Sequence, residues 1–358
     1  MRVFVLTHFP SPYQVELFNA LAAERNIDLE VFYLHQSHYT RQWMNQAVAH
    51  TAHYLNVDRP AIGNAFQCIR SADLCIISYY AERLAAELLG ERSTTQRPWI
   101  FWGERPGLHA HAVLGRLFRR CKLRALHHSS APIWGIGRWA VEQYRNEFSE
   151  QRHYADVPYF SDLQRFQAVA QPRSDKCVFL FSGALIKRKG VDLLAKAFVD
   201  LARSHSTVEL IVLGDGEYLP HVRKTLHPCA DCVRFLGFKD WNELPQVYQS
   251  AHFLCAPSRH DGWGIVVPEA LAAGLPVIST NRTGAAIEFI QTEKNGWLIP
   301  AGDLRALTEA MHEAANLSLA QRDQLSANAR ASVANHQLAD GARKIMTEIE
   351  YTLAHWPS

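Results

Sequence analysis

The sequence lacks the phosphate-loop signals that define two large classes of nucleotide-binding protein. It contains no GxxxxGK[ST] pattern, and no GxGxxG follows the first apolar run, because residues 7–18 (THFPSPYQVELF) include no glycine. These absences disfavour P-loop phosphoryl transfer and argue against a Rossmann dinucleotide site near the N-terminus. None of the 18 histidines lies in an HExxH pattern, and no Asp-x-Asp pair is present to hold a metal ion.

Long apolar runs are also missing. No window approaches 18 consecutive apolar residues, and the apolar core of the opening MRVFVLTHFP is too short for a signal peptide. The net charge of +2 gives no argument for a nucleic-acid partner. We therefore expect a cytoplasmic protein, with peripheral contact with the inner face of the membrane left open.

Cysteine is scarce, odd in number and scattered. Five of the seven lie in or beside apolar runs, as buried free thiols do in a reducing compartment: Cys68, Cys75, Cys121, Cys177 and Cys255. The remaining two form a single CxxC pair, Cys229 and Cys232. A metal or redox role is one reading of this pair, and a plain loop before a strand is the favoured one.

What the sequence does contain is an alternation of short apolar runs and helical patterns. With 358 residues and 48% apolar side chains, the chain is long enough for two domains. Strand-like runs occur at 2–7, 29–34, 73–80, 99–102 and 132–137, and again at 177–182, 208–214, 233–238, 252–258 and 275–280. Helical patterns between them predict parallel sheets joined by right-handed crossovers.

The alternation breaks in a polar, proline-containing stretch at 166–176. We predict an acceptor-binding domain at 1–165, a linker at 166–175 and a second domain at 176–340. Residues 341–358 should form a helix that returns to the first domain. Both domains are expected to be Rossmann-like, doubly wound α/β structures that face a cleft, with ligands at the carboxyl ends of the strands.

Two loops of the second half could hold a diphosphate. In SGALIKRKG (182–190), Gly183 precedes a cationic run that includes Arg188 and Lys189, at a strand's carboxyl end. In LGDGE (213–217), Gly214 and Gly216 would let the backbone approach a ligand. The alternatives are a solvated basic turn for the first loop and an ordinary tight turn for the second.

Two acids eight positions apart, Asp261 and Glu269, flank a predicted helix that begins near Gly264. Eight helical residues span about 12 Å, so the two carboxylates cannot share one atom. A helix N-terminus binds phosphate well and carboxylates accept from hydroxyl pairs, so the pattern suggests a nucleotide sugar. The alternative is that Asp261 caps the helix and Glu269 favours its first turn.

Together these segments resemble the retaining GT-B glycosyltransferases of the E-x7-E nucleotide-sugar family, which includes bacterial mannosyl- and glucosyltransferases and sucrose synthase. The matching pieces occur in the family's order and cover roughly residues 176–305: SGALIKRKGVDLLAKAF (182–198), VLGDGE (212–217), VRFLGF (233–238), APSRHDGWGIVVPEALAAGLPVIST (256–280) and NGWLIPAGD (295–303). The first domain matches more loosely, through SPYQVELFNALA (11–22) and VPYFSDLQRF (157–166).

The resemblance implies roles for individual residues. Lys189 corresponds to the phosphate-binding lysine, assisted by Arg188, and Glu269 to the glutamate that holds the ribose. Asp261 falls at the first glutamate, near the transferred sugar. The remaining implied contacts are the base at Phe238 and the diphosphate and sugar at Gly264, Ile265 and Val266.

Four departures from the family pattern stand out. Asp261 is one methylene shorter than the usual glutamate, and Ala184 stands where many members carry arginine. The glycine pair of the first loop is replaced by residues 11–14, so Tyr13 becomes a candidate acceptor-facing residue. The first-domain histidine is not evident, and Glu104 lies at roughly that strand end as a second acceptor- or sugar-facing candidate.

The expected activity is transfer of a sugar from a UDP- or GDP-sugar to a hydroxyl of a glycan or lipid-linked acceptor, with retention and without a metal or other cofactor. Surface polysaccharide synthesis is the expected setting. A non-catalytic nucleotide-sugar-binding protein and a GT-B phosphorylase or epimerase remain as alternatives.

A basic helical pattern at 111–128 is the last candidate site. From Arg105 to Arg138, both included, the sequence has seven Arg or Lys and no acidic residue. The pattern suits either anionic lipids or a core-packed helix with a solvated basic face, the second being slightly favoured.

Overall fold

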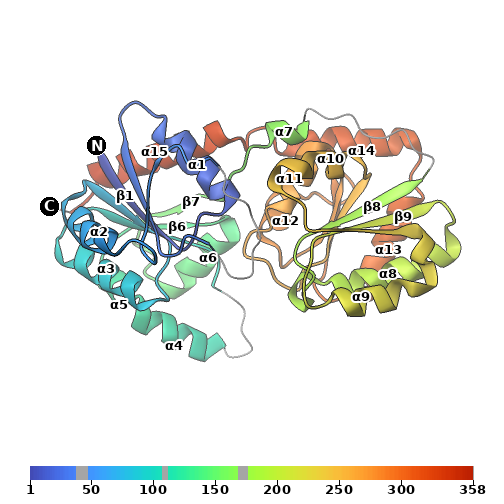
Figure 1. Ribbon diagram of the computed structural model, residues 1–358, viewed down its shortest axis with the longest axis horizontal. Coiled ribbons are helices and arrows are strands. Elements are labelled where there is room, and N and C mark those ends of the chain that lie inside the picture. The colour runs from blue at the N-terminus through green and yellow to red at the C-terminus, as the bar shows by residue number, and fades with distance from the viewer. Residues whose placement is uncertain (38–46, 107–111, 168–175, 358) are drawn as a thin grey trace. The chain divides into compact units, whose positions relative to one another are not determined.

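The computed structural model describes residues 1–37, 47–106, 112–167 and 176–357 (Figure 1). By its internal contacts the chain divides into two compact units, Met1–Ser161 with Leu338–Ser358, and Asp162–Gln337. Most of the predicted linker, residues 168–175, lies outside the described residues.

The first unit contains a seven-stranded parallel sheet in the order β3-β2-β1-β4-β5-β6-β7. Its strands are β1 (Arg2–Thr7), β2 (Asp28–Tyr33), β3 (Thr51–Tyr54), β4 (Leu74–Ile77), β5 (Trp99–Gly103), β6 (Ile133–Gly135) and β7 (Tyr154–Asp156). Its helices are α1 (Pro12–Ala22), α2 (Arg59–Ser71), α3 (Arg83–Thr94), α4 (Ala112–Lys122), α5 (Arg124–His127), α6 (Arg138–Glu147) and α15 (Leu338–Ala354). In Figure 1, α1 and α15 lie on one face of this sheet and α2, α3 and α5 on the other.

The second unit contains a six-stranded parallel sheet in the order β10-β9-β8-β11-β12-β13. Its strands are β8 (Cys177–Ser182), β9 (Val208–Leu213), β10 (Val233–Gly237), β11 (Phe253–Ala256), β12 (Val277–Thr280) and β13 (Gly296–Ile299). Its α-helices are α7 (Gln164–Gln167), α8 (Val191–Ser204), α9 (Leu219–Leu226), α10 (Leu244–Gln249), α11 (Val266–Ala273), α12 (Gly284–Phe289), α13 (Leu304–Ala315) and α14 (Leu319–Ser332). Three short 3₁₀ segments complete it: η1 (Lys187–Lys189), η2 (His227–Cys232) and η3 (Trp241–Glu243).

Helices on both faces explain why the strands read as continuous apolar runs. In β1 the side chains alternate between two buried environments, so Phe4 and Leu6 join the core under α2 and α3 while Val3 and Val5 are buried on the other face. In the second unit, Phe179 and Phe181 of β8 pack into a core with α8, α9 and α13. This two-sided burial makes the carboxyl ends of the strands the place where polar groups can gather.

Three details differ from the expectations. The basic pattern does not form one helix, because the chain turns at Leu123, which is buried between α4 and α5. The C-terminal helix expected at 341–358 spans Leu338–Ala354. Cys121 is exposed near the end of α4 rather than buried, whereas the other four cysteines expected to be buried are buried.

Candidate donor site at the carboxyl edge of the second sheet

The basic loop lies where the sequence places it, directly after β8. Residues 187–189 form the single turn η1, and Gly190 follows with φ of 72° as the N-cap of α8. A Cβ at Gly190 would lie 1.9 Å from the carbonyl oxygen of Pro257, so only glycine lets this loop pack against the residues after β11. Arg188 and Lys189 are thereby held beside the segment that carries Asp261.

The Asp261 carboxylate is the partner of both cations. Lys189 Nζ donates to Asp261 Oδ2, and Arg188 Nη1 lies 3.8 Å from Asp261 Oδ1. Burial alone would raise the pKa of the Asp261 carboxyl, but the charges of Lys189 and Arg188 outweigh it and hold that pKa below its ordinary value. The acid is therefore ionised at neutral pH and orients the cations.

A second ion pair fixes the segment from the other side. The Arg259 guanidinium donates to both carboxylate oxygens of Asp192 at 2.6 and 2.8 Å, and it also reaches the carbonyl oxygen of Lys187 at 2.6 Å. Asp192 lies in the first turn of α8, so this fork joins the helix, the basic loop and the segment before α11. The sequence pattern did not single out Arg259 and Asp192, because the two residues are 67 positions apart in the chain and only the fold pairs them.

The N-terminus of α11 begins immediately after this network. Gly264 has φ of 86°, and a Cβ there would lie 2.6 Å from Thr283 Cγ2 and 3.5 Å from Asp261 Oδ2. Ile265 is the N-cap and Val266 the first helical residue, so their N–H groups belong to the set that has no partner within a helix. This positive end of the helix dipole and the cations of η1 are thus held close to Asp261, as an anion-binding arrangement requires.

Glu269 lies in the first turn of α11 and is 1% exposed. Tyr248 of α10 donates to Glu269 Oε2 at 3.3 Å, and burial together with the Glu269 charge raises the pKa of this phenol well above its ordinary value. Tyr248 also interacts with Ser182 at the end of β8. The tyrosine was not anticipated, and it links the predicted ribose-binding acid to the start of the basic loop.

The glycine turns meet at the carboxyl ends of the neighbouring strands. The Gly183 amide donates to the carbonyl oxygen of Leu213 at 3.0 Å, and the Gly214 amide to that of Gly237 at 2.8 Å. The Gly216 amide donates to Asp215 Oδ1 at 2.7 Å. Phe238 follows β10 and is exposed, so the structure places the predicted donor-binding residues of the second unit along one edge of its sheet.

In the first unit, Glu104 and Tyr13 are linked through a residue that the sequence did not single out. Tyr159 donates its hydroxyl to Glu104 Oε1 at 3.1 Å, and its ring lies 4.8 Å from that of Tyr13. Tyr144 donates to the Glu104 carbonyl oxygen at 2.7 Å and so fixes the backbone after β5. The two acceptor-facing candidates therefore belong to one polar and aromatic group at the carboxyl edge of the first sheet.

Comparison with solved structures defines the class of fold. Sucrose-phosphate synthase from Thermosynechococcus elongatus aligns with a TM-score of 0.77 over 99% of both chains at 16% identity. Anabaena HepE in complex with UDP and glucose aligns with a TM-score of 0.77 over 98% of this chain and 100% of the other at 15% identity. WaaG, a glycosyltransferase involved in lipopolysaccharide biosynthesis, aligns with a TM-score of 0.72 over 97% of this chain and 99% of the other at 18% identity. The chain has the GT-B fold.

The family follows from the sequence of the second unit. Residues 163–332 match the family model described as glycosyl transferases group 1, and we identify this part of the chain as a domain of that family. A GDP-mannose-dependent alpha-(1-6)-phosphatidylinositol monomannoside mannosyltransferase from Mycobacterium tuberculosis is 33% identical over 225 residues, 57% of this chain and 58% of that protein. Spore coat protein SA of Bacillus subtilis is 34% identical over 133 residues, 35% of each chain. The chain thus spans less than two thirds of the length of these relatives.

Proposed function

We propose that the protein is a glycosyltransferase that moves a sugar from a nucleoside diphosphate sugar to a hydroxyl, with retention of the anomeric configuration. One observation carries the proposal. Arg188 and Lys189 pair with Asp261 just before the N-terminus of α11, and the buried Glu269 in the first turn of the same helix accepts from Tyr248. Cationic, dipolar and carboxylate groups in this order suit a diphosphate flanked by hydroxyl-bearing sugars.

The chemistry proposed at this edge needs few groups. As the bond between the anomeric carbon and the diphosphate oxygen breaks, negative charge gathers on the leaving diphosphate, where Arg188, Lys189 and the α11 amides stabilise it. The acceptor oxygen bonds to the anomeric carbon on the same face, and its proton passes to the leaving phosphate. We propose that Asp261 orients Lys189 and faces the transferred sugar, that Glu269 binds the ribose, and that no metal takes part in this step.

The donor and acceptor classes are also proposed. The mycobacterial relative is named for GDP-mannose and HepE was determined with UDP, which supports a GDP- or UDP-sugar donor. The name of that relative refers to a phosphatidylinositol monomannoside, and WaaG is described as involved in lipopolysaccharide biosynthesis. Both support our proposal of surface polysaccharide synthesis at the cytoplasmic side of a membrane. Among the described residues, no helix is long and apolar enough to span a bilayer.

Helix α4 supplies the proposed membrane contact. Leu117 and Phe118 are 55% and 52% exposed, so neither is packed in a core. Arg119 is turned to Glu147 of α6, which its guanidinium reaches at 2.8 Å, whereas Arg120 is exposed. Exposed apolar side chains beside cations favour the interfacial reading of the helix over the core-packed one.

The test combines donor binding with transfer. UDP-, GDP-, ADP- and dTDP-sugars are screened by thermal shift, because a preferred ligand raises the midpoint. With the preferred donor, we expect Lys189→Ala and Glu269→Ala each to reduce transfer about 100-fold or more, because each removes a charge that contacts the donor. Lys187→Ala is the matched control, since Lys187 is exposed in the same loop and should keep nearly full activity.

Three results would contradict the proposal. Wild-type rates in Lys189→Ala and Glu269→Ala would remove the site assignment. An inverted product, read from its anomeric proton by NMR, would exclude the retaining reaction. Tight nucleoside diphosphate binding with neither transfer nor donor hydrolysis would support the non-catalytic binding protein instead.

A further inference from the structure

Three metal-ligating side chains gather at the topological switch point of the first sheet. From β1 the chain proceeds to β2 and β3 on one side and then crosses to β4 on the other side of β1. His8 follows β1, His35 lies shortly after β2, and Glu82 lies between β4 and α3. In open α/β sheets, ligands bind in the crevice between loops that diverge at such a point.

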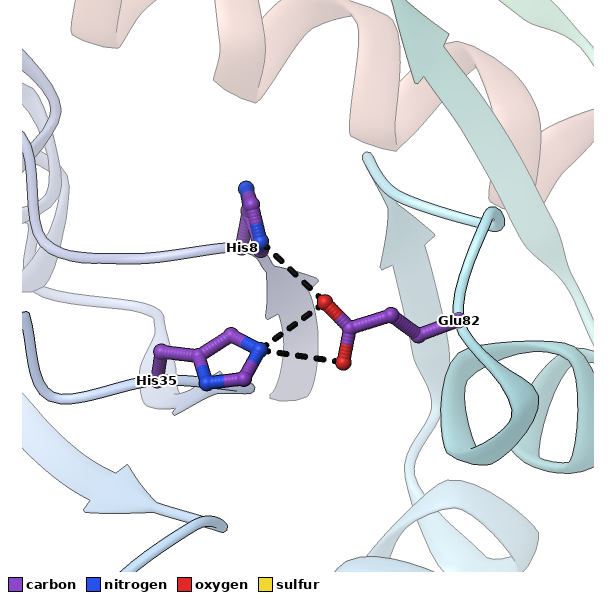
Figure 2. A group of neighbouring side chains, drawn as sticks. All are labelled: His8, His35 and Glu82. Atoms are coloured by element: carbon purple, nitrogen blue, oxygen red, sulfur yellow. Dashed lines mark hydrogen bonds and ion pairs between the residues drawn. The ribbon is translucent and has the colours of Figure 1, made fainter. Parts of the chain in front are cut away.

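The three side chains converge on one small volume (Figure 2). His8 Nε2 lies 3.2 Å from Glu82 Oε1, and His35 Nε2 lies 2.8 and 3.0 Å from the two carboxylate oxygens. One ligand atom from each of the three residues lies within 4.8 Å of the others. All three are partly exposed, at 27% for His8 and 37% for His35 and Glu82, so an ion could enter from solvent.

The surroundings hold these side chains in place. The His8 ring stacks on Tyr79 with centroids 4.2 Å apart and planes 3° from parallel. The His35 amide donates to the His8 carbonyl oxygen at 2.9 Å, which ties the two histidine loops together. Glu82 occupies the N-cap position of α3, yet its side chain makes no cap hydrogen bond and is directed to the imidazoles instead.

We propose that His8, His35 and Glu82 form a binding site for a divalent transition-metal ion of the zinc class. Two imidazole nitrogens and one carboxylate oxygen are a ligand set that suits such an ion, whereas magnesium and calcium prefer oxygen ligands alone. At metal–ligand distances of about 2.0–2.1 Å, tetrahedral ligand atoms lie about 3.3 Å apart. Glu82 Oε1 lies 2.8 Å from His35 Nε2 and 3.2 Å from His8 Nε2, so these two separations need to grow only slightly to admit the ion.

Three protein ligands leave one position of a tetrahedral ion open. Such an open position is the mark of a site that exchanges a water or binds a ligand oxygen, in contrast to a closed structural site. The site lies in the first unit, whereas the proposed donor residues lie in the second, so metal binding here is independent of the proposed function. The ion would bind an oxygen ligand at the switch-point edge and would not be needed to bind the nucleotide.

The test measures zinc binding directly in the full-length chain stripped with EDTA. A Cys229→Ser/Cys232→Ser background removes the CxxC pair as a competing zinc ligand. We expect one equivalent of zinc by elemental analysis and by competition with a chromogenic chelator. We expect His35→Ala and Glu82→Gln each to weaken binding at least tenfold, since loss of even an outer-shell partner costs 10- to 100-fold. His53→Gln is the matched control, because His53 pairs with Glu30 at 3.3 Å in the same unit but belongs to no three-residue metal-ligand group in the part of the chain that the structure describes.

Two further measurements keep the result decisive. First, the metal-free variants should melt at the same temperature as the metal-free parent, which shows that their fold is intact. Zinc should then raise the melting temperature of the parent but not that of the variants. Cobalt should give visible bands of a four-coordinate ion without thiolate charge transfer. Equal zinc affinity in the parent, His35→Ala and Glu82→Gln, or binding that follows the remaining cysteines, would overturn the proposal and leave an ion-paired triad.

Discussion

At the scale of single residues, Arg188, Lys189 and Arg259 of the proposed donor edge each lie beside an acid. Asp261 reaches Lys189 because Gly190 lets the two segments pack closely. Arg259 and Asp192 form a separate fork that holds the same segment. The proposed donor edge is therefore preorganised before any ligand arrives.

The Asp192–Arg259 fork should show in the pH dependence of stability. Burial would raise the pKa of the Asp192 carboxyl, but the hydrogen bonds and charge of Arg259 outweigh it and lower that pKa below its ordinary 3.8. A lowered folded-state pKa gives stability that is present above the unfolded value and is lost as pH falls through the folded value. We expect Asp192→Asn to lower the free energy of unfolding by about 1–3 kcal/mol near pH 7, and this difference to shrink below about pH 4.

Urea unfolding at several pH values measures this effect. Asp200→Asn is the control, because Asp200 is 58% exposed on the same helix and pairs only with His312 at 3.3 Å among the contacts of the described residues. If the difference in the free energy of unfolding between wild type and Asp192→Asn stays constant down to pH 2, the charge of Asp192 does not stabilise the fold.

At the scale of elements, the loops after parallel strands carry the chemistry of both units. The donor candidates follow β8, β9, β10 and β11, and the histidine cluster follows β1, β2 and β4. Each helix that begins at such a loop turns its N-terminus to the same edge of the sheet, so dipole and side chains act together there. Helix α4 differs in another way, because its apolar side chains Leu117 and Phe118 are exposed and pack into no core.

Helix α4 should bind anionic vesicles through these two side chains. Burying a leucine or phenylalanine contributes about 1.5–3 kcal/mol, so Leu117→Ser/Phe118→Ser should weaken vesicle binding at least tenfold. Flotation with anionic and with neutral vesicles measures this binding, and we expect much less protein to float with the neutral vesicles. Val57→Ser, which removes another exposed apolar side chain of the same unit, should change nothing. Binding that ignores lipid charge, or that survives the double substitution, would exclude this contact.

At the scale of the whole chain, the last helix completes the first unit. Helix α15 packs on α1, and a Cβ at Gly341 would lie 2.6 Å from the Phe160 ring and 3.0 Å from Leu17 Cδ1. His153 binds Glu348 at 2.7 Å, and the Trp356 indole donates to the carbonyl oxygen of Gln96 at 2.8 Å. The unit is therefore assembled from the two ends of the chain.

This assembly predicts how the chain responds to crowding at Gly341. Gly341→Leu should push α15 away from Phe160 and Leu17 and destabilise the first unit by about 1–3 kcal/mol, as overpacking of a tight site does. Hydrogen exchange should then rise in α1 and α15 but stay unchanged in α8 and α11 of the second unit. Gly63→Leu in α2 is the control in the same unit, because a Cβ there meets nothing within 4 Å. Equal exchange in α1 of wild type and Gly341→Leu would contradict the prediction.

Much of the fold could be predicted from the sequence, because periodicity is a local property. Apolar runs such as 2–7 and 177–182 became β1 and β8, and the C-terminal helix was expected to return to the first domain. Short strands such as β3 and β7 escaped prediction, since three or four residues with partly exposed side chains carry little pattern. The break at Leu123 and the exposure of Cys121 depend on what packs against α4 and α5, and no local pattern encodes that.

The sequence by itself determined which charged and flexible residues the proposed donor edge contains: the cations 188 and 189, the acids 261 and 269, the glycine turns and their order along the chain. Only the tertiary structure decided which of these groups meet. It paired Lys189 with Asp261 across 72 positions, placed Tyr248 on Glu269, and brought His8, His35 and Glu82 together from three loops. The physical reason is that parallel strands bring their carboxyl ends to one edge whatever their separation in sequence, so residues far apart in the chain become neighbours there.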